Sequence, residues 1–289
     1  MAQMRIDKIS YRYGRGTPFE IAALRDVSFE IGEGELIGVI GHTGSGKSTL
    51  MQMLNALLKP DSGTVYLNGA DIHKDKTSVY RARFQVGLCF QYPEYQLFGE
   101  TCAEDIAFGP RNMGLPEEEV KARTERAADF VRLDRALLQR SPFDLSGGQK
   151  RRCAVAGVLA MQPEILILDE PTAGLDPAGR DAMISLIRAY RQNTGATVIF
   201  VTHSMEIAAS VSERILVMDH GTLALDGTPA EVFSQAELLE KCGLAPPFSA
   251  RVLSALRARG YDAPDAFAPE ETADALCALL RAEEKQTVC

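Results

Sequence analysis

The most constraining feature of the sequence is a glycine-rich stretch that fits the phosphate-binding pattern of Gly, four residues, Gly, Lys and Ser or Thr. Its nine residues are Gly41, His42, Thr43, Gly44, Ser45, Gly46, Lys47, Ser48 and Thr49. An apolar segment over 36–40 predicts a buried strand before it, and a helical pattern over 50–58 follows it. A strand, a tight turn and a helix start together aim backbone N–H groups at phosphate oxygens. The stretch therefore predicts a nucleotide site, with Lys47 on the β- and γ-phosphates and Ser48 on Mg²⁺.

Composition limits the classes of protein to which the chain can belong. Its 289 residues suffice for one large domain or two modest ones, and the 46% hydrophobic and 24% charged residues are typical of a soluble globular protein. No apolar run approaches the roughly 18–20 residues that span a bilayer, and the first residues lack the apolar core of a signal peptide. We therefore expect a cytoplasmic protein whose link to any membrane runs through a partner. The net charge of -8 argues against nucleic acid as the main ligand.

The cysteines do not follow a metal-binding or disulfide pattern. The six are Cys89, Cys102, Cys153, Cys242, Cys277 and Cys289. They form no Cys-x-x-Cys pair, and no histidine lies at ligand spacing from them along the chain. We expect free thiols in a reducing compartment and no metal cluster.

Two acidic residues and a histidine follow strands that we expect in one buried sheet. Asp169 and Glu170 end the apolar segment over 165–170, and His203 follows the apolar segment over 197–201. Ligands of open α/β sheets bind at the carboxyl ends of the strands, so these side chains should meet the phosphate loop. Asp169 would then face Mg²⁺, Glu170 an attacking water and His203 the γ-phosphate. Without a phosphate loop, solvated acids and a structural histidine would be the better interpretation.

Two further features have both a functional and an ordinary interpretation. Ser146, Gly147, Gly148 and Gln149 open an apolar helix, where they predict a second phosphate-binding turn; the alternative is a helix cap. Tyr13 ends the strand expected over 5–13, where it either stacks on a nucleotide base or lies on the surface.

An aromatic stretch follows Gln91 and shows neither helical nor strand periodicity. Its apolar members are Tyr92, Tyr95, Leu97 and Phe98. One interpretation is a local core. The other is a groove that accepts a helix of a membrane partner, with Glu94, Gln96 and Glu100 as its polar rim.

The remaining patterns predict how the chain is divided. Strands are expected over 5–13, 24–31, 64–68, 86–90, 165–170, 197–201, 214–219 and 222–226. Helical patterns over 101–113 and 116–133 make 93–160 a helical insertion in an α/β core. Asp176 caps a helix that starts at Pro177. After residue 235 the pattern weakens, so we expect a main domain over 1–235. The extension over 236–289 holds two short helices, at 249–259 and 272–284, as a dimerisation element or plain surface.

Together, these stretches resemble the ATP-binding cassette ATPases over about residues 4–235. The motifs are the phosphate loop, Gln91, the Leu-Ser-Gly-Gly-Gln signature at 145–149, the strand at 165–170, the segment 173–176 and His203. The resemblance implies an α/β phosphate-loop NTPase with a RecA-like core, an antiparallel β subdomain, an inserted helical subdomain and a small C-terminal helical appendix.

It also implies ATP hydrolysis at a dimer interface. One chain offers Lys47, Ser48 and Asp169 to the phosphates and Mg²⁺, and the other offers the signature from the opposite side. Gln91 would join the Mg²⁺ ligands and link them to the helical insertion, and Asp176 would belong to a dimer-contacting loop.

A narrower resemblance is carried by the segments 90–98 and 104–110, and by 202–206. These are similar to the second ATPase of energy-coupling factor transporters, which import vitamins and transition-metal ions. That family implies a second ATPase, as a heterodimer rather than a homodimer. It also implies a membrane T component, an S component reached through it, and a position at the cytoplasmic face of the cell membrane. Cys102 and Cys153 stand where the family pattern leads us to expect an aliphatic residue.

Other functions remain open at this point. One is the ATPase of a conventional importer or exporter. Another is a soluble cassette protein of translation or DNA repair, which the single phosphate loop and the lack of sustained heptads disfavour. A phosphoryl-transfer enzyme outside transport is the weakest alternative, because no acceptor-substrate pocket is evident in the sequence.

Overall fold

A mostly parallel sheet forms the centre of the protein. In the computed structural model, which describes residues 2–264, 266–267 and 269–287, this sheet has six strands. Their spatial order is β10 (Thr222–Gly227), β9 (Arg214–Asp219), β3 (Leu36–Ile40), β8 (Thr197–Val201), β7 (Ile165–Asp169) and β6 (Val86–Cys89). Only β10 runs antiparallel to its neighbour. The three central strands β3, β7 and β8 are buried along their whole length, as their continuous apolar sequences predict.

One face of this sheet packs against a helix and a second sheet. The helix is α1 (Lys47–Leu54), and the second sheet is antiparallel, in the order β2 (Ile21–Ile31), β1 (Met4–Tyr13), β4 (Ser62–Leu67) and β5 (Ala70–Asp71). The helix ends earlier than the expected 50–58. Ala56 adopts a left-handed φ of 57°, which a continuing helix does not allow.

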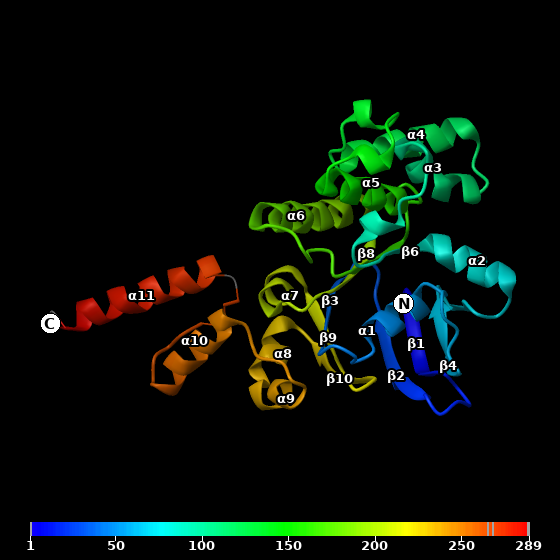
Figure 1. The fold of residues 1–289 in the computed structure, drawn as a ribbon. Helices are drawn as coiled ribbons and strands as arrows, with labels where there is room; N and C mark the ends of the chain where they lie inside the picture. The colour runs from blue at the N-terminus through cyan, green and yellow to red at the C-terminus, as the bar shows by residue number, and fades with distance from the viewer. Residues whose placement is uncertain (1, 265, 268, 288–289) are drawn as a thin grey trace.

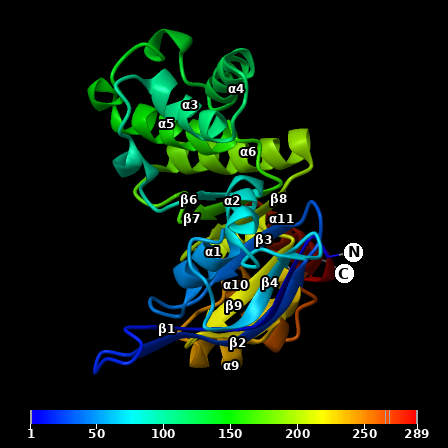
Figure 2. The ribbon, with the colours of Figure 1, turned by 90° about the vertical axis from the view of Figure 1, so that its right-hand side faces the viewer.

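The other face of the sheet carries the helices of the inserted segment. They are α3 (Cys102–Asn112), α4 (Glu117–Phe130) and α5 (Gly147–Leu159), with the short 3₁₀ helices η1 (Pro93–Gln96), η2 (Arg135–Leu137) and η3 (Pro142–Asp144). They form the upper lobe in Figures 1 and 2, and α6 (Pro177–Thr194) lies between this lobe and the sheet. Leu166 and Phe200 of the sheet share one core with Ile106 of α3 and Ile187 of α6.

Three helices were not expected from the sequence. They are α2 (Lys76–Gln85), α7 (Met205–Val211) and the six-residue α9 (Ala236–Lys241). In α2 only Ala82 is fully buried, so the segment lacks the apolar stripe by which an amphipathic helix is predicted. In α7, seven residues are too few to show a helical period.

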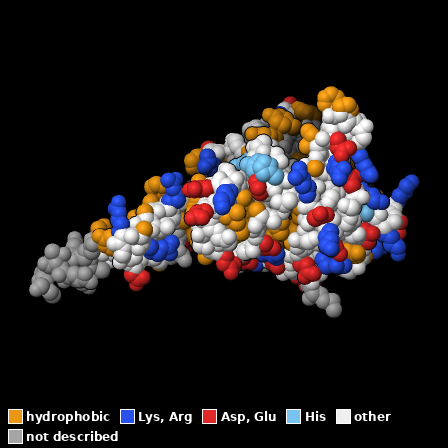
Figure 3. Space-filling model, turned by 90° about the horizontal axis from the view of Figure 1, so that it is seen from below, with side chains coloured by type: hydrophobic (Ala, Val, Ile, Leu, Met, Phe, Trp, Pro, Cys, Tyr) orange, Lys and Arg blue, Asp and Glu red, His pale blue; other side chains and the backbone are white. Residues whose placement is uncertain are grey.

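The C-terminal segment is mostly helical, and its last two helices project from the rest of the molecule (Figure 1). Its helices are α8 (Pro229–Ser234), α9 (Ala236–Lys241), α10 (Phe248–Ala258) and α11 (Pro269–Thr287). Leu253, Ala263 and Ala266 form a small core of their own there. Seen from below, acidic and basic side chains are interspersed over the surface (Figure 3). Among the described residues, no helix is both long enough and apolar enough to cross a membrane.

The described cysteines are free thiols, as the sequence predicts. They are Cys89, Cys102, Cys153, Cys242 and Cys277. The prediction for Cys289 falls outside the described residues. Cys102 and Cys153 lie together in the helical lobe, where both are buried among apolar side chains. A small apolar thiol is compatible with these buried positions, where the family pattern has an aliphatic side chain.

Candidate nucleotide-binding site

The phosphate loop joins β3 to α1 in a conformation that only glycine allows at two of its positions. Gly46 caps α1 with a left-handed φ of 101°, and an added Cβ would lie 2.5 Å from the carbonyl oxygen of Ala23. At Gly41 an added Cβ would lie 2.3 Å from the carbonyl oxygen of Met218. The two glycines let the loop pack against the neighbouring backbone, so that the N-terminus of α1 faces the pocket beside it.

Lys47 lies across this loop and is buried. Its Nζ donates hydrogen bonds to the carbonyl oxygens of Gly41 at 2.7 Å and His42 at 2.9 Å. Burial lowers the pKa of the ammonium group, and the nearby carboxylates of Glu170 and Asp169 oppose that shift. An ammonium held in this position is suited to a polyanionic ligand that would add negative charge beside it.

Asp169 and Glu170 end β7 next to Lys47, and both are buried. Burial raises the pKa of Asp169, while a hydrogen bond from Ser48 and the charge of Lys47 oppose the shift. Burial also raises the pKa of Glu170 to about 7. The backbone of Glu170 is left-handed, with a φ of 49°, a strained conformation for a glutamate. Its Oε1 is buried and makes no hydrogen bond within the described chain. A strained carboxylate with one oxygen that makes no hydrogen bond is typical of a reactive site.

His203 stands beside Glu170, as the order of the strands predicts. Its Nε2 lies 3.3 Å from Oε1 of Glu170, and its backbone N–H donates to the same carboxylate. Burial and the charge of Lys47 lower the pKa of His203, while the pKa of Glu170 is raised. The contact is therefore not a full ion pair near neutral pH, and the imidazole remains able to bind a further group.

Eleven of the residues singled out in the sequence line one pocket at the carboxyl edge of the sheet. They are Tyr13, Thr43, Gly44, Gly46, Lys47, Ser48, Thr49, Gln91, Asp169, Glu170 and His203. The Tyr13 hydroxyl lies 3.2 Å from Oγ1 of Thr49, which holds the ring at the mouth of the pocket. Side chains from four other segments, those of Tyr13, Gln91, His203 and the pair Asp169 and Glu170, thus converge on the phosphate loop.

Three members of the loop do not line that pocket. Gly41 and Ser45 are buried beneath the loop. The ring of His42 turns away, and its Nε2 lies 3.2 Å from Oδ1 of Asp219 at the end of β9. Any contact of these three with a nucleotide would come from the loop backbone.

The signature residues lie apart from this pocket. Ser146 caps α5: its hydroxyl accepts from the N–H of Gln149, whose side chain accepts from the N–H of Ser146. The ordinary interpretation, a helix cap, is thus present in the structure. It does not explain Gly147 and Gly148, since an added Cβ at either would meet no atom of the described chain within 4 Å. Asp176 likewise caps α6 by accepting from the N–H of Gly179.

One structural residue of the site was not anticipated. Arg151 is buried in α5, and its guanidinium donates to the carbonyl oxygens of Ala173 at 2.8 Å and Glu170 at 3.5 Å. It joins the signature helix to the end of β7. In the sequence Arg151 belongs to a Lys-Arg-Arg run, which is typical of a charged, solvent-exposed face. The run does not reveal that one of its members is buried.

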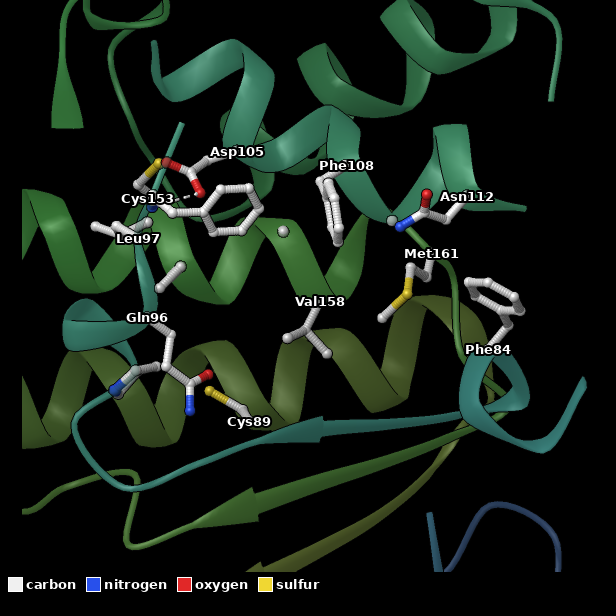
Figure 4. Close-up of a pocket in the computed structure, with 15 residues that line it drawn as sticks. Phe84, Cys89, Gln96, Leu97, Asp105, Phe108, Asn112, Cys153, Val158 and Met161 are labelled. Atoms are coloured by element: carbon white, nitrogen blue, oxygen red, sulfur yellow. Dashed lines mark hydrogen bonds between the residues drawn. The ribbon is translucent and has the colours of Figure 1, made fainter. Parts of the chain in front are cut away.

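The aromatic stretch after Gln91 is divided by the structure. A pocket lies between β6, α3 and α5, and Leu97 and Phe98 line it (Figure 4). Tyr92 and Tyr95 lie outside that lining and pair with each other, with ring centroids 6.0 Å apart. Leu97 is only 9% exposed and belongs to the core of the helical lobe. Its expected place as an exposed anchor is therefore wrong: its side chain packs against the lobe as well as lining the pocket.

Comparisons with known proteins agree with this fold. The family described as ABC transporter matches residues 24–173. The energy-coupling factor transporter ATP-binding protein EcfA2 of Caldanaerobacter subterraneus subsp. tengcongensis is 50% identical over 279 residues, which cover 96% of this chain and 98% of that protein. EcfA2 of Clostridium perfringens is 47% identical over 280 residues, again 96% and 98% of the two chains.

Solved structures show the same architecture. The structure of cbiO1 from Clostridium perfringens, described as part of the ABC transporter complex cbiONQ, has a TM-score of 0.72 and 37% identity. It covers 83% of this chain and 94% of its own. A dimeric post-hydrolysis state of the ATP-binding cassette MJ0796, bound to ADP and Pi, has a TM-score of 0.69 and 28% identity. It covers 78% of this chain and 98% of its own.

The phosphate loop, the paired carboxylates and the separate signature helix define an ABC transporter ATPase, and the family match extends over more than half of the chain. Relatives of 47–50% identity, aligned over almost their full length, narrow the assignment. The chain belongs to the family of the energy-coupling factor transporter ATP-binding proteins EcfA2.

Proposed function

We propose that the chain hydrolyses ATP at an interface with a second cassette ATPase and so powers uptake by an energy-coupling factor transporter. The observation that carries the proposal is the division of the ATPase motifs. The phosphate loop, Asp169, Glu170 and His203 line one pocket, while the described lining leaves out the signature at 145–149. A second chain would complete the site by placing its signature over the nucleotide.

The residues of the pocket have the chemistry that ATP hydrolysis needs. Lys47 would exchange its hydrogen bonds to the loop carbonyls for contacts with phosphate oxygens. Glu170, whose Oε1 makes no hydrogen bond within the described chain, would take a proton from the attacking water. His203 would hold the γ-phosphate from the side next to Glu170.

The same pocket fits a magnesium ion. The Ser48 hydroxyl hydrogen-bonds to Asp169, so two oxygen donors already lie together beside the phosphate loop. Oxygen donors of this kind, with Gln91 from the same lining, suit the hard Mg²⁺ ion. When bound, the ion would neutralise negative charge on the transferred phosphoryl group.

The membrane partner would dock on the pocket of Figure 4. Three aromatic rings line it, those of Phe84, Phe98 and Phe108, and the last two are 61% and 50% exposed. Large exposed apolar side chains around a concavity are typical of helix-in-groove recognition. Gln96 and Asp105 supply polar groups in the lining. We assign this groove to a helix of the T component and place the chain at the cytoplasmic face of the membrane.

The groove is joined to the nucleotide site by a short segment. Gln91 lines the nucleotide pocket, and Gln96 to Phe98 line the groove. Closure of the ATPase dimer would shift both together. Vitamins or transition-metal ions would be the cargo, selected by an S component that this chain reaches only through the T component.

Co-purification and uptake test this function together. The tagged chain, extracted from native membranes, should carry a related ATPase and a T component that mass spectrometry identifies. Vesicles reconstituted with this complex should take up the cargo only when ATP is present inside them. Uptake should be lost with Glu170→Gln although the complex still assembles. Recovery of the chain without any membrane protein, or uptake that survives Glu170→Gln, would contradict the proposal.

A further inference from the structure

Two histidines and an aspartate meet behind the phosphate loop, on the side away from the nucleotide pocket. His42 belongs to the loop, Asp219 is the last residue of β9, and His220 begins the turn that leads to β10. Nε2 of His42 lies 3.2 Å and Nε2 of His220 lies 3.9 Å from Oδ1 of Asp219. All three ligand atoms lie within 4.8 Å of one another. The fold thus joins residues that are almost 180 positions apart in the chain.

A hydrogen bond fixes how the His42 ring presents itself to this cluster. Its Nδ1 lies 2.8 Å from the carbonyl oxygen of Thr43. Because a carbonyl only accepts, Nδ1 carries the hydrogen, and in the neutral ring Nε2 is left with a lone pair. A metal-binding imidazole is typically oriented in this way, by donating its other N–H to a backbone carbonyl.

The lone pair of His42 faces a carboxylate oxygen. Nε2 of His42 and Oδ1 of Asp219 are both buried atoms that make no hydrogen bond within the described chain. Two acceptors at 3.2 Å repel each other unless a positive charge lies between them. A proton on Nε2 would satisfy those two atoms, but it would repel any positive charge on the nearby ring of His220. A metal cation would use all three.

We propose that His42, Asp219 and His220 form a binding site for a divalent transition-metal ion of the zinc type. Two imidazoles and one carboxylate are donors that zinc accepts, whereas Mg²⁺ prefers oxygen alone. Bond lengths of about 2.0–2.2 Å place neighbouring ligand atoms of a tetrahedral zinc site about 3.3–3.5 Å apart. The observed 3.2 Å and 3.9 Å lie close to that range, and His220, at 77% exposure, is free to close the difference. Water would supply the fourth ligand.

The ion would fasten the phosphate loop to the turn between β9 and β10. The two are already joined by the N–H of Gly221, which donates to the carbonyl oxygen of Ser45 at 3.0 Å. The carbonyl oxygen of His42 accepts from Lys47. An ion that binds the folded chain but not the unfolded chain raises the melting temperature of the protein. This rise is a readout independent of ATP hydrolysis.

The test uses the untagged, chelator-treated chain without nucleotide, because tags and ATP themselves bind zinc. Cys277→Ser and Cys289→Ser are introduced in every protein, since thiols are zinc ligands. His220→Asn removes one ligand while keeping a residue that tolerates the left-handed φ of 44° at this position. His73→Asn, which removes a histidine outside the cluster, is the matched control.

Calorimetry with Zn²⁺ and the visible spectrum with Co²⁺ measure binding, and thermal melts measure its effect on folding. We expect one Zn²⁺ per chain with a dissociation constant of about 10 μM or lower. His220→Asn should weaken binding at least about tenfold and lose the zinc-dependent rise in melting temperature, whereas His73→Asn should retain both. Equal binding by the parent with Cys277→Ser and Cys289→Ser and by its His220→Asn variant would overturn the proposal. So would equal loss in the two histidine variants. Absence of binding by the parent would leave a protonated His42 paired with Asp219, and would overturn it as well.

Discussion

At the scale of single residues, the site combines groups that would be unfavourable elsewhere in a fold. Glu170 has a left-handed backbone, a buried carboxylate and an oxygen without a hydrogen bond. Each of these features costs stability in a group that has only a structural role. Lys47 beside it bridges two loop carbonyls. The two residues therefore give separable predictions, one for the chemical step and one for binding.

Glu170→Gln should affect the chemical step alone. Glutamine keeps the size and polarity of the side chain but cannot accept the proton of water. Turnover should fall by about 10²–10⁴-fold while ATP affinity is retained. Steady-state hydrolysis and equilibrium nucleotide binding measure the two quantities. Since a buried carboxylate is replaced by a neutral amide, the melting temperature should not fall. Unchanged turnover would show that a residue other than Glu170 acts as the general base.

Lys47→Ala should lose tight ATP binding and nearly all hydrolysis. The variant should still fold, but it should be less stable than the parent, because Lys47 also makes hydrogen bonds within the chain. Its ammonium group satisfies the carbonyl oxygens of Gly41 and His42, and loss of those bonds should cost about 1–2 kcal/mol of unfolding free energy. Chemical denaturation measures that cost, and fluorescent-nucleotide titration measures binding. Hydrolysis at the parent rate would exclude Lys47 from the nucleotide site.

At the scale of the elements, α5 and the groove are the parts that should face other chains. The cap formed by Ser146 and Gln149 accounts for the start of α5. Folding of the helix does not require the two glycines between them, Gly147 and Gly148. Glycine in a helix is less favourable than alanine, so a reason outside this chain is needed for both. The exposed aromatic rings of the groove are likewise not required for folding, because they lie outside the core of the lobe.

Gly148→Ala should therefore separate folding from function. We expect an unfolding free energy that is unchanged or higher by up to about 1 kcal/mol, because alanine is the better helix former. ATP hydrolysis by the assembled complex should be lost, since a Cβ would occupy the space where the partner's nucleotide approaches. The comparison needs a denaturation curve of the single chain and an ATPase assay of the complex. Full activity would show that the signature does not approach a nucleotide.

Phe98→Ala combined with Phe108→Ala should abolish binding to the T component without unfolding the chain. Both rings are at least half exposed, so their removal should shift the melting temperature little. Phe19→Ala, at an 82% exposed ring on the loop between β1 and β2, is the matched control. Leu97 is unsuitable for this test, because loss of a buried leucine costs about 2–5 kcal/mol by itself. Pull-down of the T component by the double variant would reject the groove.

The sequence predicts elements whose pattern is local and fails where distant residues decide. The strands at 36–40 and 197–201 have continuous apolar sequences, and their positions are confirmed. The helix α2 was not predicted because only one of its residues, Ala82, is fully buried. Leu97 was misplaced because its burial depends on α3 and α5, whose packing no local pattern reveals. The cluster of His42, Asp219 and His220 is invisible along the chain, since its members meet only through the pairing of β3 with β9.

At the scale of the whole molecule, the two groups of ATPase motifs lie apart in the chain. The nucleotide pocket lies at the carboxyl edge of the sheet, and the signature lies at the start of α5 in the helical lobe. A nucleotide bound in the pocket would be only half enclosed by its own chain. Dimer formation should therefore depend on ATP, and hydrolysis should release the two chains.

The most direct measurement uses two copies of the chain joined by a flexible linker. Lys47→Ala and Ser146→Arg are placed either on different copies or together on one copy, so that both proteins contain the same substitutions. If sites are shared between copies, the split arrangement retains one intact site and about half of the parent activity per molecule, by counting sites. The joint arrangement then has two damaged sites and hydrolyses almost nothing. The opposite ranking of the two proteins would contradict the account, because it would mean that each copy hydrolyses ATP with its own signature.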